Sequence, residues 1–98
     1  MNNTLTVVVR LKARAGMEDQ VREELQKLLE PTRAEPGCIN FDLHEAAESP
    51  GLFLVHENWK SEGDLRRHFE MPYLRSWIVK ADALLAEPME LTRWHRVG

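Results

Sequence analysis

The chain has 98 residues, a formal net charge of −3 and one cysteine, Cys38. This length accommodates one hydrophobic core, so we expect residues 1–98 to fold as a single domain. The lysines and arginines are dispersed among acidic residues and form no basic stripe, which argues against a nucleic-acid partner. The sequence has no apolar run of about 18 residues and no apolar signal segment near its start, so we expect a cytoplasmic protein without a membrane role.

The first part of the chain predicts one strand followed by one long helix. Within residues 5–12, large apolar side chains occupy every odd-numbered position, while three of the four even-numbered positions are polar or charged. This period of two indicates a strand. Apolar side chains then recur at helical spacing across residues 21–32. Pro31 lies inside this pattern, so we expect the helix to bend or end near Glu30, with a further turn reaching Ala34.

The rest of the chain predicts a hairpin, two helical segments and a last strand. The turn sequence Ser49-Pro50-Gly51 separates the two hairpin strands, and Ser61 with Asp64 resembles a capping box at the start of the next helix. The third helical stretch follows Pro72. The expected strand ranges are 38–46, 52–60 and 89–97.

This order of elements is the split βαβ arrangement of the ferredoxin-like fold. We therefore expect an α+β protein with a four-stranded antiparallel sheet whose one face is covered by helices. Strands 5–12 and 52–60 carry apolar side chains on both of their faces. We expect a homodimer in which the uncovered sheet faces pack together. A sparsely apolar open face that needs no partner is the structural alternative.

Polar side chains gather on the hairpin. A hairpin centred on Pro50 pairs His44 with His56 and Asp42 with Asn58, which places these four side chains on one face. Two histidines and a carboxylate could hold a transition metal. Cross-strand polar pairing at a dimer surface explains the same residues more simply, so we expect no metal site.

Several motifs carry a resemblance to a known family. They are Arg33-Ala34-Glu35-Pro36-Gly37-Cys38, Phe41-Asp42-Leu43-His44, Glu57-Asn58-Trp59, Leu65 and His68. The chain resembles the antibiotic biosynthesis monooxygenase family, whose small dimeric α/β-barrel proteins include quinol monooxygenases. The resemblance implies a monooxygenase without a cofactor that oxidises a small quinol or polycyclic phenol with O2. The family also includes haem-degrading enzymes and a signal-molecule isomerase, so the reaction type stays open.

Oxygenation without a cofactor makes a physical demand on the site. Ground-state O2 is a triplet, so a phenolic substrate must itself supply an electron, and it does so readily only as a phenolate. A histidine with a pKa of about 6.5 lies roughly 3.5 units below a phenol with a pKa of about 10, a deficit of about 5 kcal/mol. Hydrogen-bond donors in a water-poor cavity would have to supply the difference.

His68 is our candidate for the base, because it lies on the inward side of the second predicted helix. Trp59, Asn58 and Tyr73 are the candidates for orienting the substrate or stabilising its anion. Tyr73 stands where relatives often carry a histidine, which puts a second imidazole in doubt. The candidates for binding the substrate are His44, Phe41, Phe53, Phe69 and Trp77. Core packing is the alternative explanation for His68, Trp59 and the other large rings. The alternatives are a surface or cap position for Tyr73, hydrogen bonds to neighbouring backbone groups for Asn58, and cross-strand polar pairing for His44.

Three other functions stay open. An isomerase or lyase of a small signalling or metabolic molecule could use the same proton-transfer groups without oxygen. A non-catalytic protein could bind a small ligand in the same pocket. Haem degradation is disfavoured, because some haem-degrading members of the family use an asparagine on the first strand, whereas residues 5–12 of this chain contain none.

Overall fold

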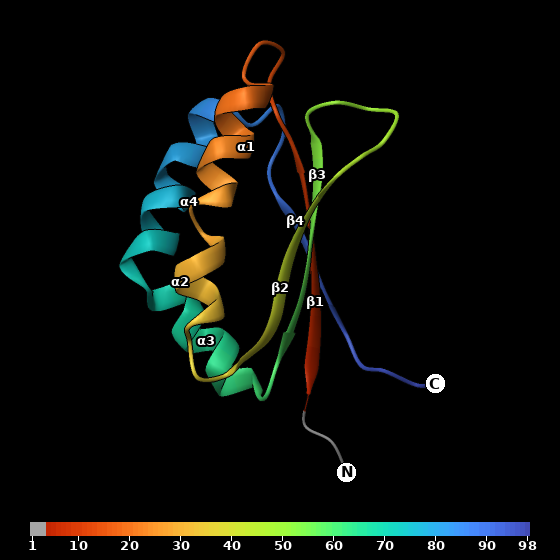
Figure 1. Ribbon diagram of the computed structural model, residues 1–98, viewed down its shortest axis with the longest axis vertical. Coiled ribbons are helices and arrows are strands. Elements are labelled where there is room, and N and C mark those ends of the chain that lie inside the picture. Colours follow the sequence, from red (N-terminus) through yellow and green to blue (C-terminus); the bar gives the residue numbers. More distant parts are fainter. Residues whose placement is uncertain (1–3) are drawn as a thin grey trace.

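The computed structural model of the protein describes residues 4–98 and contains a four-stranded antiparallel sheet with helices on one face (Figure 1). The sheet order is β2-β3-β1-β4, the order of the ferredoxin-like fold, so the predicted α+β fold class is confirmed. In chain order, the elements are β1 (Leu5–Lys12), α1 (Glu18–Gln26), α2 (Leu29–Arg33), β2 (Cys38–Glu45), β3 (Leu52–Trp59), α3 (Glu62–Glu70), α4 (Pro72–Leu84) and β4 (Glu90–Trp94).

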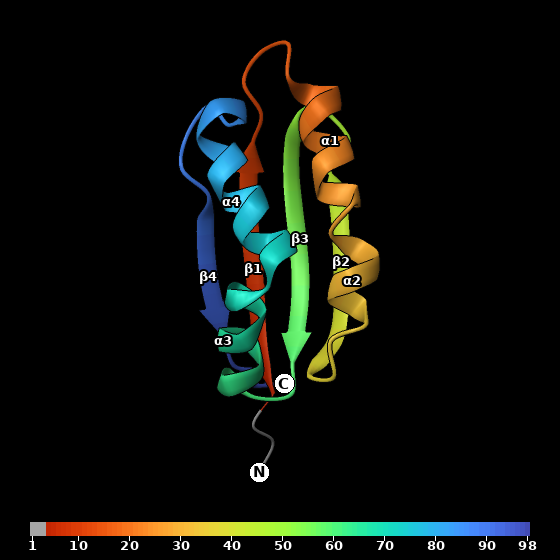
Figure 2. The same cartoon turned by 90° about the vertical axis from the view of Figure 1, so that its left-hand side faces the viewer.

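The helices form one layer over the sheet. Figure 2 shows α1 and α2 in front of β2 and β3, with α3 and α4 in front of β1 and β4. The inward side chains of the two central strands are almost completely buried, and those of Val7, Phe53 and Trp59 are examples. The hydrophobic core therefore lies between the helix layer and one face of the sheet.

The long predicted helix is divided in two, and the division lies earlier than expected. α1 ends at Gln26 and α2 begins at Leu29, so the expected break near Glu30 is wrong by about one turn. Pro31 has no backbone N–H, and its ring conflicts with the carbonyl four residues earlier, which belongs to Lys27. The regular helical hydrogen-bond pattern is therefore interrupted one turn before Pro31, and Pro31 itself lies inside α2. The further turn expected to reach Ala34 is α2, which ends at Arg33 with Ala34 as its C-cap.

The hairpin register also differs from the expected one. Asp42 pairs with His56 and His44 pairs with Leu54, so the pairing of His44 with His56 is wrong. The hairpin is centred one residue earlier than Pro50, which moves each partner by two positions. A shift of two preserves the side-chain alternation, so Asp42, His44, His56 and Asn58 still share one face.

The start of α3 is fixed by the predicted cap. The backbone N–H of Asp64 donates to Ser61 Oγ at 3.2 Å, and Ser61 Oγ donates to Asp64 Oδ2 at 2.8 Å. A preceding loop residue, Gly37, lies against this cap, because a Cβ at Gly37 would overlap the side chain of Asp64. The close approach joins the start of β2 to α3 and brings the loop beside Glu35 to the inner side of the helix.

The outer face of the sheet is of mixed character. It carries Val8 and Leu54 together with the polar side chains of Thr6, His56 and Asn58. Leu54 is 40% exposed in this single chain, and Trp94 of β4 is 56% exposed. The second apolar face expected from the sequence therefore also carries polar side chains.

Candidate functional site

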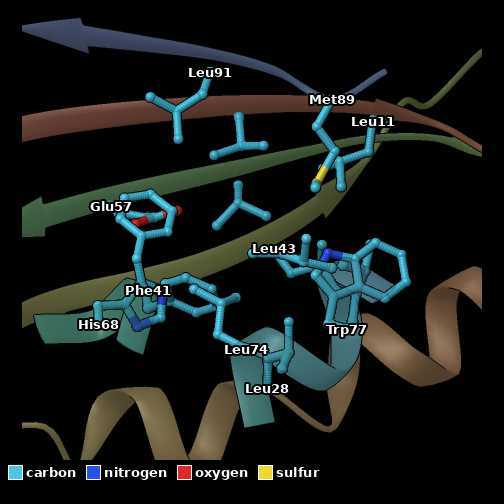
Figure 3. A pocket seen from close by; sticks show the side chains of 15 residues that line it. Leu11, Leu28, Phe41, Leu43, Glu57, His68, Leu74, Trp77, Met89 and Leu91 are labelled. Atoms are coloured by element: carbon cyan, nitrogen blue, oxygen red, sulfur yellow. The ribbon is translucent and has the colours of Figure 1, made fainter. Parts of the chain in front are cut away.

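A cavity of about 220 Å³ lies between the helix layer and the sheet (Figure 3). Its titratable lining residues are Glu57 and His68, which Figure 3 shows at one end, while Trp77, Met89 and Leu11 lie at the other. The remaining lining side chains are all apolar: Val9, Leu25, Leu28, Phe41, Leu43, Val55, Phe69, Leu74, Ile78 and Leu91. The cavity is thus an apolar chamber with two proton-carrying groups at one end.

His68 lies on the buried side of α3 and is held from two directions. Its Nδ1 is 2.8 Å from Glu35 Oε2, and its ring packs on that of Trp59 with 4.6 Å between centroids. Burial lowers the pKa of His68, against the opposing influence of the Glu35 carboxylate. A neutral imidazole that donates its Nδ1 proton to Glu35 has Nε2 as its acceptor. His68 is therefore oriented as a base whose free nitrogen is Nε2.

Glu35 follows α2 and binds two other segments. Besides His68 of α3, it accepts a hydrogen bond from the hydroxyl of Tyr73 in the first turn of α4. The same hydroxyl lies 3.3 Å from the carbonyl oxygen of Pro31. Burial, followed by the hydrogen bond to Glu35, raises the pKa of Tyr73 above its ordinary value. Tyr73 therefore stays protonated and helps to fix Glu35 in place.

Glu57 is the second polar group of the cavity. It lies on the inward face of β3 between Val55 and Trp59, and it is only 4% exposed. The indole Nε1 of Trp59 donates to Glu57 Oε1 at 2.8 Å. Burial raises the pKa of Glu57 to about 7, against the opposing effect of the indole hydrogen bond, and the negative charge of Glu35 adds a smaller contribution in the same direction as burial. Near neutral pH this carboxyl group can both hold and release a proton.

The structure brings six of the sequence-predicted site residues to the cavity or to the side chains directly around it. His68, Phe41, Phe69 and Trp77 line the cavity. Trp59 lies behind His68, and Tyr73 reaches the site through Glu35. These positions fit the predicted group of residues, and their roles remain predictions.

Three other predicted residues lie elsewhere. Phe53 is buried in the core, with the Arg22 guanidinium 5.9 Å from its ring centroid, and it does not line the cavity. Asn58 and His44 lie on the outer face of the sheet, where Asn58 Nδ2 donates to Asn40 Oδ1 at 2.8 Å. The structure therefore does not bring Asn58 or His44 to His68.

Sequence reasoning missed Glu35 and Glu57 as site residues. The signal for Glu57 was present, because residues 53, 55, 57 and 59 point to the same face of a strand and three of them are Phe, Val and Trp. A carboxylate at an inward position needs a reason, since its burial is costly. Glu35 carried no comparable local signal, because it is separated by 33 positions from the histidine that it contacts.

The outer-face histidines do not form a metal site in the part of the chain that the structure describes. Within residues 4–98, no three His, Cys, Asp or Glu side chains are grouped so that they could hold a metal ion. The Nδ1 of His56 instead lies 3.5 Å from the amide of Asn40. The same residues contain no helix with the length and apolar character needed to cross a bilayer.

The sequence profile of one family, described as antibiotic biosynthesis monooxygenase, matches residues 4–80. The chain belongs to the antibiotic biosynthesis monooxygenase family. This assignment agrees with the resemblance seen in the sequence motifs, and it covers all elements from β1 to most of α4.

Two curated proteins are similar to the chain over most of its length. "Uncharacterized protein sll1783" of Synechocystis is 30% identical over 90 residues, and the match covers 92% of this chain but only 61% of that protein. "Putative monooxygenase Rv0793" of Mycobacterium tuberculosis is 29% identical over 92 residues, covering 94% of this chain and 90% of that protein.

Solved structures of similar proteins agree with the fold over nearly the whole chain. The structure of Rv0793 has a TM-score of 0.92 at 27% identity and covers 97% of this chain and 96% of that one. The crystal structure of PA3566 from Pseudomonas aeruginosa has a TM-score of 0.94 at 28% identity, covering 100% of this chain and 98% of that chain.

Proposed function

We propose that this protein is a monooxygenase that oxidises a small quinol or polycyclic phenol with O2, without a cofactor, in the cavity between helices and sheet. The observation that carries the proposal is the apolar cavity in which His68, held at Nδ1 by Glu35, presents Nε2 as a base. Membership of the family and the name of the relative Rv0793 support the oxygenase class.

The size and lining of the cavity favour a small aromatic substrate. Its volume of about 220 Å³ lies below the roughly 300–1,000 Å³ of pockets that hold drug-sized ligands. The walls of leucine, phenylalanine and tryptophan side chains suit flat apolar rings, and the two titratable lining residues, Glu57 and His68, lie together at one end. A quinol of one or two rings, with a hydroxyl group directed at His68, matches this distribution.

His68 would take the phenolic proton. The imidazolium that forms would be stabilised by the Glu35 carboxylate at 2.8 Å, and it would in turn be the counter-ion of the phenolate. The Trp59 indole donates to Glu57 and the Tyr73 hydroxyl donates to Glu35, so neither is available as a direct donor to the substrate. The proposed stabilisation of the phenolate therefore rests on the ion pair with His68.

We also propose that the protein is a homodimer that associates through the outer face of the sheet. The exposed side chains of Leu54 and Trp94 on that face support association, since apolar surface of this kind is commonly covered by a partner. Light scattering coupled to gel filtration would test this proposal. A molar mass near twice the 11.4 kDa of one chain is expected, and a monomer at micromolar concentration would refute it.

The central experiment is oxygen uptake by chelator-treated protein with a panel of reduced naphthoquinones and polycyclic hydroquinones, corrected for autoxidation. We expect saturable uptake that falls by about 100-fold in His68→Gln, the scale of general-base catalysis. His95→Gln is the matched control, because His95 is exposed and lies outside the cavity.

Uptake at the autoxidation rate for every compound, by folded protein that binds the compounds, would contradict the oxygenase proposal. The isomerase and binding-protein alternatives would then be favoured. Circular dichroism of both variants separates a loss of chemistry from a loss of folding.

A further inference from the structure

The buried carboxyl group of Glu57 has no role in the proton transfer proposed for His68. It lines the same end of the cavity, and Figure 3 shows both side chains there. A carboxyl group in an apolar cavity lowers stability when it ionises, so packing alone does not account for it. A glutamine could accept the same hydrogen bond from Trp59 without carrying a charge.

One oxygen of Glu57 is available to a ligand. Oε1 accepts the hydrogen bond from Trp59, whereas Oε2 has no protein hydrogen-bond partner among residues 4–98. Among residues 4–98, Thr32 Oγ1 is the one side-chain oxygen or nitrogen that is completely enclosed by protein and has no hydrogen-bond partner, and Glu57 Oε2 does not share this property. Glu57 Oε2 is therefore not sealed among protein atoms, and the space beside it is the cavity.

Burial, with a smaller contribution from the charge of Glu35, favours the protonated form of Glu57. Glu35 contributes a negative charge, and His68 is neutral because burial lowers its pKa. The third neighbouring group, the thiol of Cys38, has its pKa raised to about 11 and stays neutral. No lysine or arginine lines the cavity within the described range 4–98. Glu57 can therefore carry a proton at the pH at which His68 is free to accept one.

The proposed reaction needs such a pair of groups at its second stage. In the first stage His68 takes the phenolic proton, the phenolate gives one electron to O2, and the resulting radical pair joins through a C–O bond at a ring carbon. His68 returns its proton to the peroxide, giving a hydroperoxide. In the second stage the C–H proton at that carbon leaves, the O–O bond breaks, and the distal oxygen departs with the electron pair. A base must take the C–H proton while an acid protonates the leaving oxygen.

We propose that Glu57 is the acid of this second stage: it donates its proton to the departing oxygen, which leaves as water, while His68 accepts the C–H proton. This assignment rests on the proposed oxygenase function. The ring loses four electrons, and O2 is reduced to one new carbonyl oxygen and one water. The proton on His68 then returns to Glu57, so that hydroquinone and O2 give hydroxyquinone and water with both residues restored.

The test compares how much product forms for each O2 consumed by the wild type and by Glu57→Gln. Oxygen uptake is followed with an electrode, while hydroxyquinone and peroxide are quantified after acid quenching. We expect Glu57→Gln to keep its oxygen uptake but to lose hydroxyquinone formation by about 100-fold, with hydroperoxide or H2O2 accumulating instead. Glu48→Gln, a change of the same chemistry at an exposed hairpin position, should match the wild type.

An unchanged product yield in Glu57→Gln would overturn the inference and leave the proposed function intact. Equal loss of uptake and product would assign Glu57 to the first stage and would also overturn it. Absence of uptake in the wild type would remove the proposed function, and the inference with it.

A measurement on the wild type tests the same inference without a substitution, so it holds even if Glu57→Gln does not fold. Between pH 6 and pH 8, hydroxyquinone formed per O2 should fall as Glu57 loses its proton, and a constant ratio would contradict the assignment. Of the groups that interact with Glu57, Glu35 contributes a negative charge, the Cys38 thiol stays protonated over this range because its pKa is raised, and burial lowers the pKa of His68, which favours its neutral form.

Discussion

The buried carboxyl group of Glu57 should make the stability of the protein depend on pH in a way that one substitution removes. Its pKa is raised from 4.5 to about 7 in the folded state. Between these values the folded protein binds more protons than the unfolded chain, so stability falls as pH rises through this range. Below pH 4.5 the group is neutral in both states, and above pH 7 its full cost is present.

The size of the effect follows from the same two values. Each pH unit corresponds to about 1.4 kcal/mol, so ionised Glu57 costs about 3 kcal/mol at pH 8 and less than about 1 kcal/mol at pH 5. Glutamine has nearly the same shape and no charge to desolvate. Relative to the wild type, Glu57→Gln should gain about 2 kcal/mol or more between pH 5 and pH 8.

Urea unfolding followed by tryptophan fluorescence measures this difference at each pH, at one fixed protein concentration. Comparing variant with wild type at the same pH cancels the contribution of all other titrating groups. Glu48→Gln is the control and should show no pH-dependent difference, because Glu48 is exposed. A difference for Glu57→Gln that stays constant within about 0.5 kcal/mol between the two pH values would refute the reasoning.

Two further predictions concern packing and charge. Gly37→Ala should destabilise the protein by about 1–3 kcal/mol in the same unfolding assay, because the new Cβ would overlap the side chain of Asp64. Gly63→Ala is the control and should be neutral or stabilising, because its Cβ would meet only Ser61 Oγ at 3.7 Å. Equal effects of the two changes would disprove the close approach of Gly37 to Asp64. A sulfonated naphthohydroquinone should show kcat/KM at least about tenfold below that of its neutral parent, because the cavity lining within residues 4–98 offers no lysine or arginine to balance the sulfonate charge. Equal kcat/KM values for the two compounds would argue against this cavity as the substrate site.

Much of the fold follows from local patterns, and the exceptions have local causes too. Alternation along residues 5–12 and 52–59 determines both the strands and the faces on which their side chains lie. The position of the helix break depends on the carbonyl of Lys27, which Pro31 affects from four residues away. The hairpin register depends on how many residues the loop takes up, and the sequence 46–51 permits more than one centre.

The candidate site was predictable only where one element carries the whole signal. His68 could be placed on the inward side of its helix because its neighbours at helical spacing are apolar. Its partnership with Glu35 could not be predicted, because that contact depends on how the loop after α2 packs against α3. Asn58 has side-chain chemistry that suits substrate binding, yet the strand's own alternation directs it to the face opposite Glu57.

The carboxylate of Glu35 joins three separate segments of the chain. Through His68 and Tyr73 it links the loop after α2 to α3 and to the first turn of α4. When His68 gains a proton, its contact with Glu35 changes from a hydrogen bond with a neutral ring to an ion pair, which is the stronger interaction in a buried setting. Each proton accepted at the cavity would therefore tighten the joint between these helices. Turnover would therefore change how firmly the helices of this layer are held together.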